Sequence, residues 1–146
     1  MKFLLDTATC IFFMKGNLTV IENALQVPRK HIFLSSISLY ELYTGVGKSS
    51  GQRKTAEQQR IKKLVELFPM LIGFERDEAK ITGEIRAQIE REGGKIGPYD
   101  TLIAGQALCH DLTLVSNNVA EFSRVKSLKL TNWCQRDGTE EPDHTE

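Results

Sequence analysis

The chain has 146 residues, of which 40% are hydrophobic and 26% charged, a balance typical of a single soluble globular domain. Nineteen Lys and Arg residues offset 19 Asp and Glu residues, so the net charge of zero gives no bulk argument for a nucleic-acid partner. No apolar run approaches the roughly 18 residues of a membrane helix, and no signal peptide is recognisable, so we expect a cytoplasmic protein. Three cysteines without C-x-x-C spacing predict reduced thiols.

In chain order, short apolar runs typical of buried strands alternate with segments whose apolar residues recur at helical spacing. The expected strands are 2–5, 31–34, 70–74, 113–116 and 128–133. The expected helices are 9–15, 18–26, 37–46, 55–68, 75–93 and 97–112, with a polar loop or helix entry at 48–54. This alternation predicts a three-layer α/β/α sandwich around a short, mainly parallel sheet. We expect residues 1–133 to form one domain, followed by a polar, acidic and disordered tail at 134–146.

Three carboxylates stand alone in apolar surroundings. Asp6 ends the first strand, Glu41 lies in the helix "SISLYELYTGV", and Asp100 begins a helix that is otherwise uncharged from Pro98 to Cys109. Each has an ordinary structural explanation, since Asp6 could cap a helix, Glu41 could face solvent, and Asp100 would be favoured by the helix dipole. Together they are harder to explain, because an unpaired charge in an apolar environment is unfavourable.

One divalent cation would neutralise all three carboxylates. Ligands that are all oxygen suit Mg²⁺ or Mn²⁺ better than zinc. Such an ion can lower the pKa of a bound water and shield a phosphodiester under attack. The pattern therefore indicates metal-dependent phosphoryl chemistry as one hypothesis among others.

Three segments of the chain resemble the PIN-domain ribonuclease family, and in particular its VapC-type toxins. They are "KFLLDTATCIFFMKGN", "LSSISLYELYTGV" and "GGKIGPYDTLIAGQALCHDLTLVSNNVAEFSRVKSLKLTNW". The resemblance covers residues 2–133, and its most specific part is the "IGPYDTLIA" helix followed by "LTLVSNN" and "EFSRV". It implies a PIN-like domain.

The resemblance also implies an activity and a set of site residues. The family's acidic positions fall on Asp6, Glu41 and Asp100, and a fourth polar or acidic position falls on Asn118 or Glu121. Asp6, Glu41 and Asp100 would bind Mg²⁺ or Mn²⁺ in an endoribonuclease that acts on structured RNA such as tRNA. The implied partners are a second copy of the chain in a homodimer and a cognate VapB-type antitoxin.

The sequence departs from the family at one position. The family's opening motif reads Leu-Asp-Thr-Asn or Leu-Asp-Ser-Asn, whereas Ala8 stands at the asparagine position here. An amide there could orient a carboxylate or an ordered water, and alanine cannot. One alternative is therefore a catalytically weakened module that binds antitoxin or RNA without efficient cleavage. A second is a receiver-like or phosphatase-like fold that uses Asp6 as nucleophile or acceptor.

Overall fold

Five parallel strands form the central sheet of the computed structural model, which describes residues 1–135. Their order across the sheet is β3-β2-β1-β4-β5. The strands are β1 (Phe3–Leu5), β2 (Ile32–Ser35), β3 (Met70–Ile72), β4 (Thr113–Val115) and β5 (Leu130–Thr131). All five predicted strands are confirmed. β2 is as long as expected, and the other strands are shorter. The predicted tail lies outside the described residues except for positions 134 and 135.

Helices connect every pair of consecutive strands. They are α1 (Thr7–Met14), α2 (Leu18–Leu25), the 3₁₀ turn η1 (Arg29–His31), α3 (Ser36–Gly47), α4 (Gly51–Leu67), α5 (Arg76–Arg91), α6 (Pro98–Cys109) and α7 (Val119–Phe122). Helix α4 begins at Gly51, so most of the polar segment 48–54 is helical. Helix α7 was not predicted, because four residues are too few to display a helical period.

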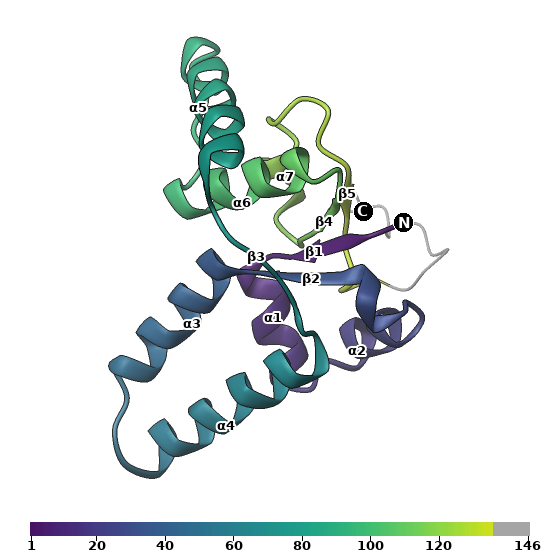
Figure 1. Ribbon diagram of the computed structural model, residues 1–146, viewed down its shortest axis with the longest axis vertical. Helices are drawn as coiled ribbons and strands as arrows, with labels where there is room; N and C mark the ends of the chain where they lie inside the picture. Colours follow the sequence, from purple (N-terminus) through teal and green to yellow (C-terminus); the bar gives the residue numbers. More distant parts are fainter. Residues whose placement is uncertain (136–146) are drawn as a thin grey trace, which may run out of the picture.

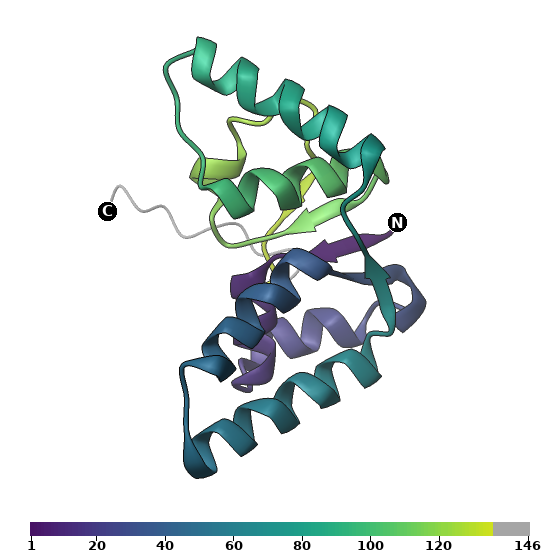
Figure 2. The same ribbon diagram turned by 60° about the vertical axis from the view of Figure 1, so that its left-hand side comes forward.

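The sheet separates two hydrophobic cores, which confirms the three-layer prediction. Helices α1–α4 lie on one face and α5–α7 on the other (Figures 1 and 2). Successive strand residues point to opposite faces, so Leu5 packs in the core beneath α1–α4 while Leu4 packs in the core beneath α5 and α6. Val115 and Leu114 of β4 divide in the same way. Both faces of the sheet are therefore covered, as parallel sheets require.

The carboxyl ends of the central strands lie at one edge of the molecule. Figure 2 shows the strand arrows running toward the side at which α1 and α6 begin. Asp6 follows β1 directly, and Ser116 follows β4 directly. Open parallel sheets form ligand sites at this edge, where polar side chains on neighbouring loops converge. Within residues 1–135, no helix is both long enough and apolar enough to span a bilayer.

Candidate active site

Asp6 is a buried carboxylate that also caps a helix. Only 4% of the residue is exposed, and its Oδ1 accepts the backbone N–H of Thr9 at 2.8 Å, which makes it the N-cap of α1. Burial raises the pKa of this carboxyl, against the opposing effect of hydrogen bonds from Ser116 and Thr9. The helix-cap and acidic-site interpretations of Asp6 are thus compatible, because one oxygen serves the cap and the carboxylate still lies at the sheet edge.

Glu41 is connected to the start of α1 by a hydroxyl. Thr7 donates its Oγ1 proton to Glu41 Oε1 at 2.6 Å, and the same Oγ1 lies 3.0 Å from Ser38 Oγ. Ser38 is fully buried on the inner face of α3. Thr7 and Ser38 therefore fix the Glu41 carboxylate next to the helix that Asp6 caps.

Asp100 lies in the first turn of α6 and is surrounded by the other acids. Its pKa is raised to about 6, chiefly by burial and then by the negative charges of Glu121, Asp6 and Glu41. A hydrogen bond between the Asp100 and Glu121 carboxyl groups has the same effect, because the protonated Asp100 is the donor. Carboxylates from the N-cap of α1 and from α3, α6 and α7 therefore influence one another.

Glu121 is the most firmly held of the four acids. Its Oε1 accepts the backbone N–H of Gly97 at 2.6 Å, and its Oε2 accepts the amide of Asn118 at 2.8 Å. These bonds lower the pKa of Glu121, with the Gly97 N–H as the largest cause. Asn118 in turn is positioned by Ser116, whose Oγ accepts the Asn118 N–H at 2.9 Å. Asn118 and Glu121, the two candidates that the sequence left open, are therefore in direct contact.

The acidic cluster, defined as Asp6, Glu41, Asp100 and Glu121, has no ion-pair partner among residues 1–135. Every ion pair within 4.0 Å in this part of the chain involves other acids. Arg124 only contributes a weaker attraction that lowers the pKa of Glu121. Four carboxylates that have no ion-pair partner among residues 1–135, two of them with raised pKa values, are oxygen donors of the kind that hard divalent cations prefer.

Three neutral groups that support these acids were not predicted from the sequence. They are the Thr7 and Ser116 hydroxyls and the Gly97 N–H. The position of Thr7 and Ser116 directly beside strand ends was a usable signal. The role of Gly97 was not visible, since it depends on a loop that meets α7 only in three dimensions.

The sequence model of the PIN-domain family matches residues 3–128 of the chain. The chain belongs to the PIN-domain family. Relatives of this PIN domain span nearly its whole length. The tRNA(fMet)-specific endonuclease VapC of Salmonella typhimurium is 36% identical over 135 residues, which cover 92% of this chain and 99% of that protein. Ribonuclease VapC2 of Rickettsia felis is 37% identical over 138 residues, covering 91% and 98%.

Solved structures agree with this PIN-domain fold. In the complex of VapBC2 from Rickettsia felis with a promoter DNA fragment, the matching chain has a TM-score of 0.82 and 34% identity, covering 91% of this chain and 99% of that one. In DNA-bound VapBC from Salmonella typhimurium, the TM-score is 0.79 at 34% identity, with 92% and 99% covered.

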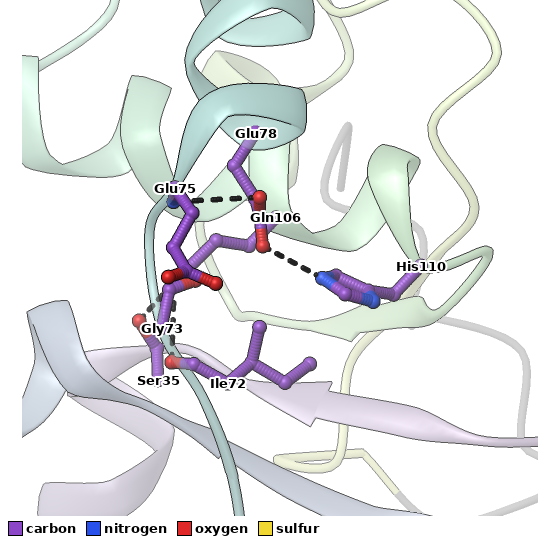
Figure 3. A network of polar contacts seen from close by, with 7 residues as sticks. All are labelled: Ser35, Ile72, Gly73, Glu75, Glu78, Gln106 and His110. Carbon is purple, nitrogen blue, oxygen red and sulfur yellow. Dashed lines mark hydrogen bonds and ion pairs between the residues drawn. The ribbon is translucent and has the colours of Figure 1, made fainter.

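A second polar network of the PIN domain lies between β3, α5 and α6 (Figure 3). Gln106 is fully buried, accepts the Ser35 hydroxyl at 2.5 Å and donates to the Gly73 carbonyl at 2.9 Å. His110 Nε2 lies 2.9 Å from Glu78 Oε2, and this contact lowers the pKa of Glu78. The network ties the carboxyl end of β2 to the middle of α6 and the end of α6 to the start of α5.

Cys109 adds a thiol to the second network. One ligand atom from each of Glu78, Cys109 and His110 lies within 4.8 Å of the others. The sequence spacing did not predict this cluster, because Glu78 comes from a different helix. Sulfur and imidazole donors suit a borderline-soft ion such as Zn²⁺, whereas the acidic cluster is suited to Mg²⁺ or Mn²⁺. The two donor sets are therefore chemically distinct.

Proposed function

We propose that the chain is an Mg²⁺- or Mn²⁺-dependent endoribonuclease and the toxin of a toxin–antitoxin pair. The observation that carries this proposal is the group of four carboxylates at the carboxyl edge of the sheet, which have no ion-pair partner among residues 1–135. Likeness along nearly the whole chain to relatives named as endonucleases and ribonucleases supports the same reaction. Phosphodiester hydrolysis next to such a concentration of negative charge requires a cation to offset it.

The acids divide into two roles in this proposal. Asp6, Glu41 and Asp100 would hold the metal, which supplies a water of lowered pKa and shields the charge of the phosphodiester. Glu121 is the outer acid, because both of its oxygens already accept hydrogen bonds from the protein. Asn118 positions Glu121, and Glu121 lies close enough to Asp100 for its negative charge to raise the pKa of the Asp100 carboxyl.

A groove beside Glu41 is an argument for RNA as the substrate. It is a cavity of about 330 Å³ between α1, α3 and α4, and its lining includes Lys15, Arg53 and Arg60. Arg53 is paired with Glu57 at 3.1 Å, which leaves Lys15 and Arg60 as cations without an ion-pair partner among residues 1–135. Cations here would neutralise backbone phosphates next to the acidic cluster, an effect that weakens as salt increases.

The relatives suggest the substrate and partners. Two VapC relatives, from Salmonella typhimurium and Shigella flexneri, are named as specific for tRNA(fMet), so we propose a structured RNA such as tRNA as substrate. The solved VapBC assemblies make a VapB-type antitoxin the expected partner. We also propose a homodimer, and a domain that ends near residue 133.

The proposal is tested by RNA cleavage under defined metal conditions. Purified chain is incubated with tRNA in EDTA, and then with Mg²⁺ or Mn²⁺ restored, beside an Asp6→Asn variant prepared identically. We expect cleavage only in the metal-restored wild type. Equal cleavage by the variant would indicate a contaminating nuclease. RNA binding without cleavage in any metal would favour the alternative, a binding module weakened at Ala8.

Ala8 provides a gain-of-function prediction. It lies half-buried in the first turn of α1, two residues after Asp6. An amide at this position could hydrogen-bond a carboxylate or an ordered water of the metal site, and lost contacts of this kind typically reduce metal affinity or activity about 10- to 100-fold. We therefore expect Ala8→Asn to raise metal-dependent cleavage about 10-fold, measured at subsaturating Mn²⁺.

The matched control is Ala8→Leu, which has nearly the same shape as asparagine but no amide. It should leave cleavage at or below the wild-type rate. Equal rates for Ala8→Asn and the wild type would show that this chain has lost nothing at position 8.

A further inference from the structure

Two exposed tyrosines form a pair at the edge of the acidic cluster. Tyr40 on α3 is 53% exposed and Tyr99 on α6 is 41% exposed, and neither belongs to the hydrophobic cores. Their hydroxyls lie 3.1 Å apart, and their rings meet edge to face with centroids 5.5 Å apart and an interplanar angle of 67°. The residues that follow them in sequence are Glu41 and Asp100, both members of the acidic cluster.

The position of the pair is fixed by two helices rather than by a loop. Tyr40 and Tyr99 are far apart in sequence, and their contact joins the outer surfaces of α3 and α6. The pKa of Tyr99 is raised, first by the hydrogen bond between its hydroxyl and that of Tyr40 and also by the charge of Glu41. The rings therefore lie within electrostatic reach of the site at which the phosphodiester would bind.

The chemistry of the pair fits a nucleobase better than a phosphate. The four carboxylates repel the RNA backbone, so affinity near the site must come from the metal or from contacts that carry no opposing charge. Stacking on an aromatic ring is such a contact, and unpaired bases of single-stranded RNA commonly stack on Tyr, Phe and Trp. In a duplex, the base faces are hidden by neighbouring bases and cannot stack on a side chain.

We propose that the Tyr40–Tyr99 pair is a stacking site for an unpaired nucleobase next to the scissile phosphate. The proposal deepens the proposed ribonuclease function and rests on it. It assigns substrate selectivity to these two rings, which would favour cleavage in loops and single-stranded segments of a structured RNA. The hydroxyl-to-hydroxyl bond serves to hold the two rings at a fixed angle.

The test measures RNA binding separately from cleavage. In an Asp6→Asn background with Mn²⁺ present, a labelled single-stranded oligoribonucleotide is titrated with protein and its fluorescence anisotropy is followed. We expect Tyr40→Leu and Tyr99→Leu each to weaken binding about 5- to 100-fold, the usual range for loss of one stacked base. Tyr40→Phe and Tyr99→Phe keep the rings and should bind within about 3-fold of the parent.

Two controls separate stacking from general surface effects. Tyr43 is also 53% exposed on α3 but has no contact with Tyr99, so Tyr43→Leu should bind RNA like the parent. An abasic oligomer of equal length keeps the phosphates and removes the bases. The parent and the Tyr40 and Tyr99 leucine variants should bind it equally weakly.

Several outcomes overturn the proposal. They are unchanged RNA affinity in both leucine variants, an equal loss in Tyr43→Leu, a loss in the phenylalanine variants as large as in the leucine variants, or no RNA binding by the parent. Retained RNA affinity together with lost self-association would assign the pair to a protein interface instead. These results are distinct from failure of the proposed function, which is decided by cleavage in wild type against Asp6→Asn.

Discussion

Asp100→Asn is expected to reduce metal-dependent RNA cleavage by at least about 100-fold while raising the thermal stability of the metal-free protein at neutral pH. Loss of a supporting contact around a metal ligand already lowers activity about 10- to 100-fold, and Asp100 is proposed to be a ligand itself. The gain in stability has a separate origin. At neutral pH the metal-free acidic cluster holds mutually repelling carboxylates, and asparagine removes one of the charges.

The direction of the pH dependence follows from the raised pKa of Asp100. Its pKa is about 6 in the folded chain, compared with an ordinary value of 3.8. Between these values the folded state retains a proton that the unfolded state has lost, so raising the pH through this window destabilises the fold. The full difference would correspond to about 3 kcal/mol, and because Asp100 is partly exposed to solvent we expect about 1 kcal/mol. This amounts to about 3 °C in Tm.

Thermal unfolding at two pH values measures this effect. In EDTA, we expect the Tm of the wild type to fall by about 3 °C more than the Tm of Asp100→Asn when the pH is raised from 4.5 to 7.5. Adding Mn²⁺ at pH 7.5 should stabilise wild type and leave the variant nearly unchanged, because the ion binds the ionised cluster. Asp111→Asn is the matched control, since Asp111 is exposed and paired with Lys129 on another surface. Equal Tm values for wild type and Asp100→Asn at pH 7.5 without metal would contradict the electrostatic account.

Gly105→Ala is expected to lower the free energy of unfolding by about 2 to 3 kcal/mol. Gly105 lies on α6 where that helix crosses α5, and it faces Thr82 of α5 at close range. A Cβ at position 105 would overlap Thr82 Oγ1 and would lie 2.9 Å from its Cβ and 3.2 Å from its backbone Cα. The clash includes backbone, so α5 and α6 must separate, and overpacking of this kind typically costs about 1 to 3 kcal/mol. The Tm should fall by about 6 to 10 °C.

Two further variants test that explanation. Gly83→Ala on α5 adds the same methyl group at an exposed helical position with no heavy atom within 4 Å, and it should stabilise the chain by about 0.5 to 1 kcal/mol. Thr82→Ala should restore part of the stability of Gly105→Ala. Its Oγ1 is buried without a hydrogen-bond partner among residues 1–135, so removing it sacrifices no contact of its own. A Gly105→Ala variant as stable as the wild type would show that the helices can move apart freely.

Gly105→Ala should also disturb the geometry of the acidic cluster, because α6 carries Asp100 in its first turn. A shift of α6 away from α5 would displace Asp100 relative to Asp6 and Glu41, which belong to the opposite layer. Cleavage measured well below the Tm of the variant is therefore expected to fall, whereas Gly83→Ala should cleave at the wild-type rate.

Residue pattern alone predicted the order of strands and helices along the chain, and with it the three-layer architecture. Buried parallel strands are continuous apolar runs, and Gly or Pro residues separate them from amphipathic helices. The same local signals identified Asp6, Glu41 and Asp100, because an isolated carboxylate in an apolar segment is conspicuous without knowledge of its neighbours. The short helix α7 carried no such signal, since its four residues complete only about one turn.

Which residues act on one another depends on how the chain packs in three dimensions. Gly97 and Asn118 both hydrogen-bond Glu121 because the α5–α6 loop meets α7 in space. Thr82 and Gly105 meet because α5 and α6 cross there, and Tyr40 and Tyr99 meet because α3 and α6 lie side by side. Hydrogen bonding, steric exclusion and charge repulsion all depend on distances of a few ångströms. Such distances between residues far apart in sequence are set by packing of the whole chain, and residue pattern alone does not contain them.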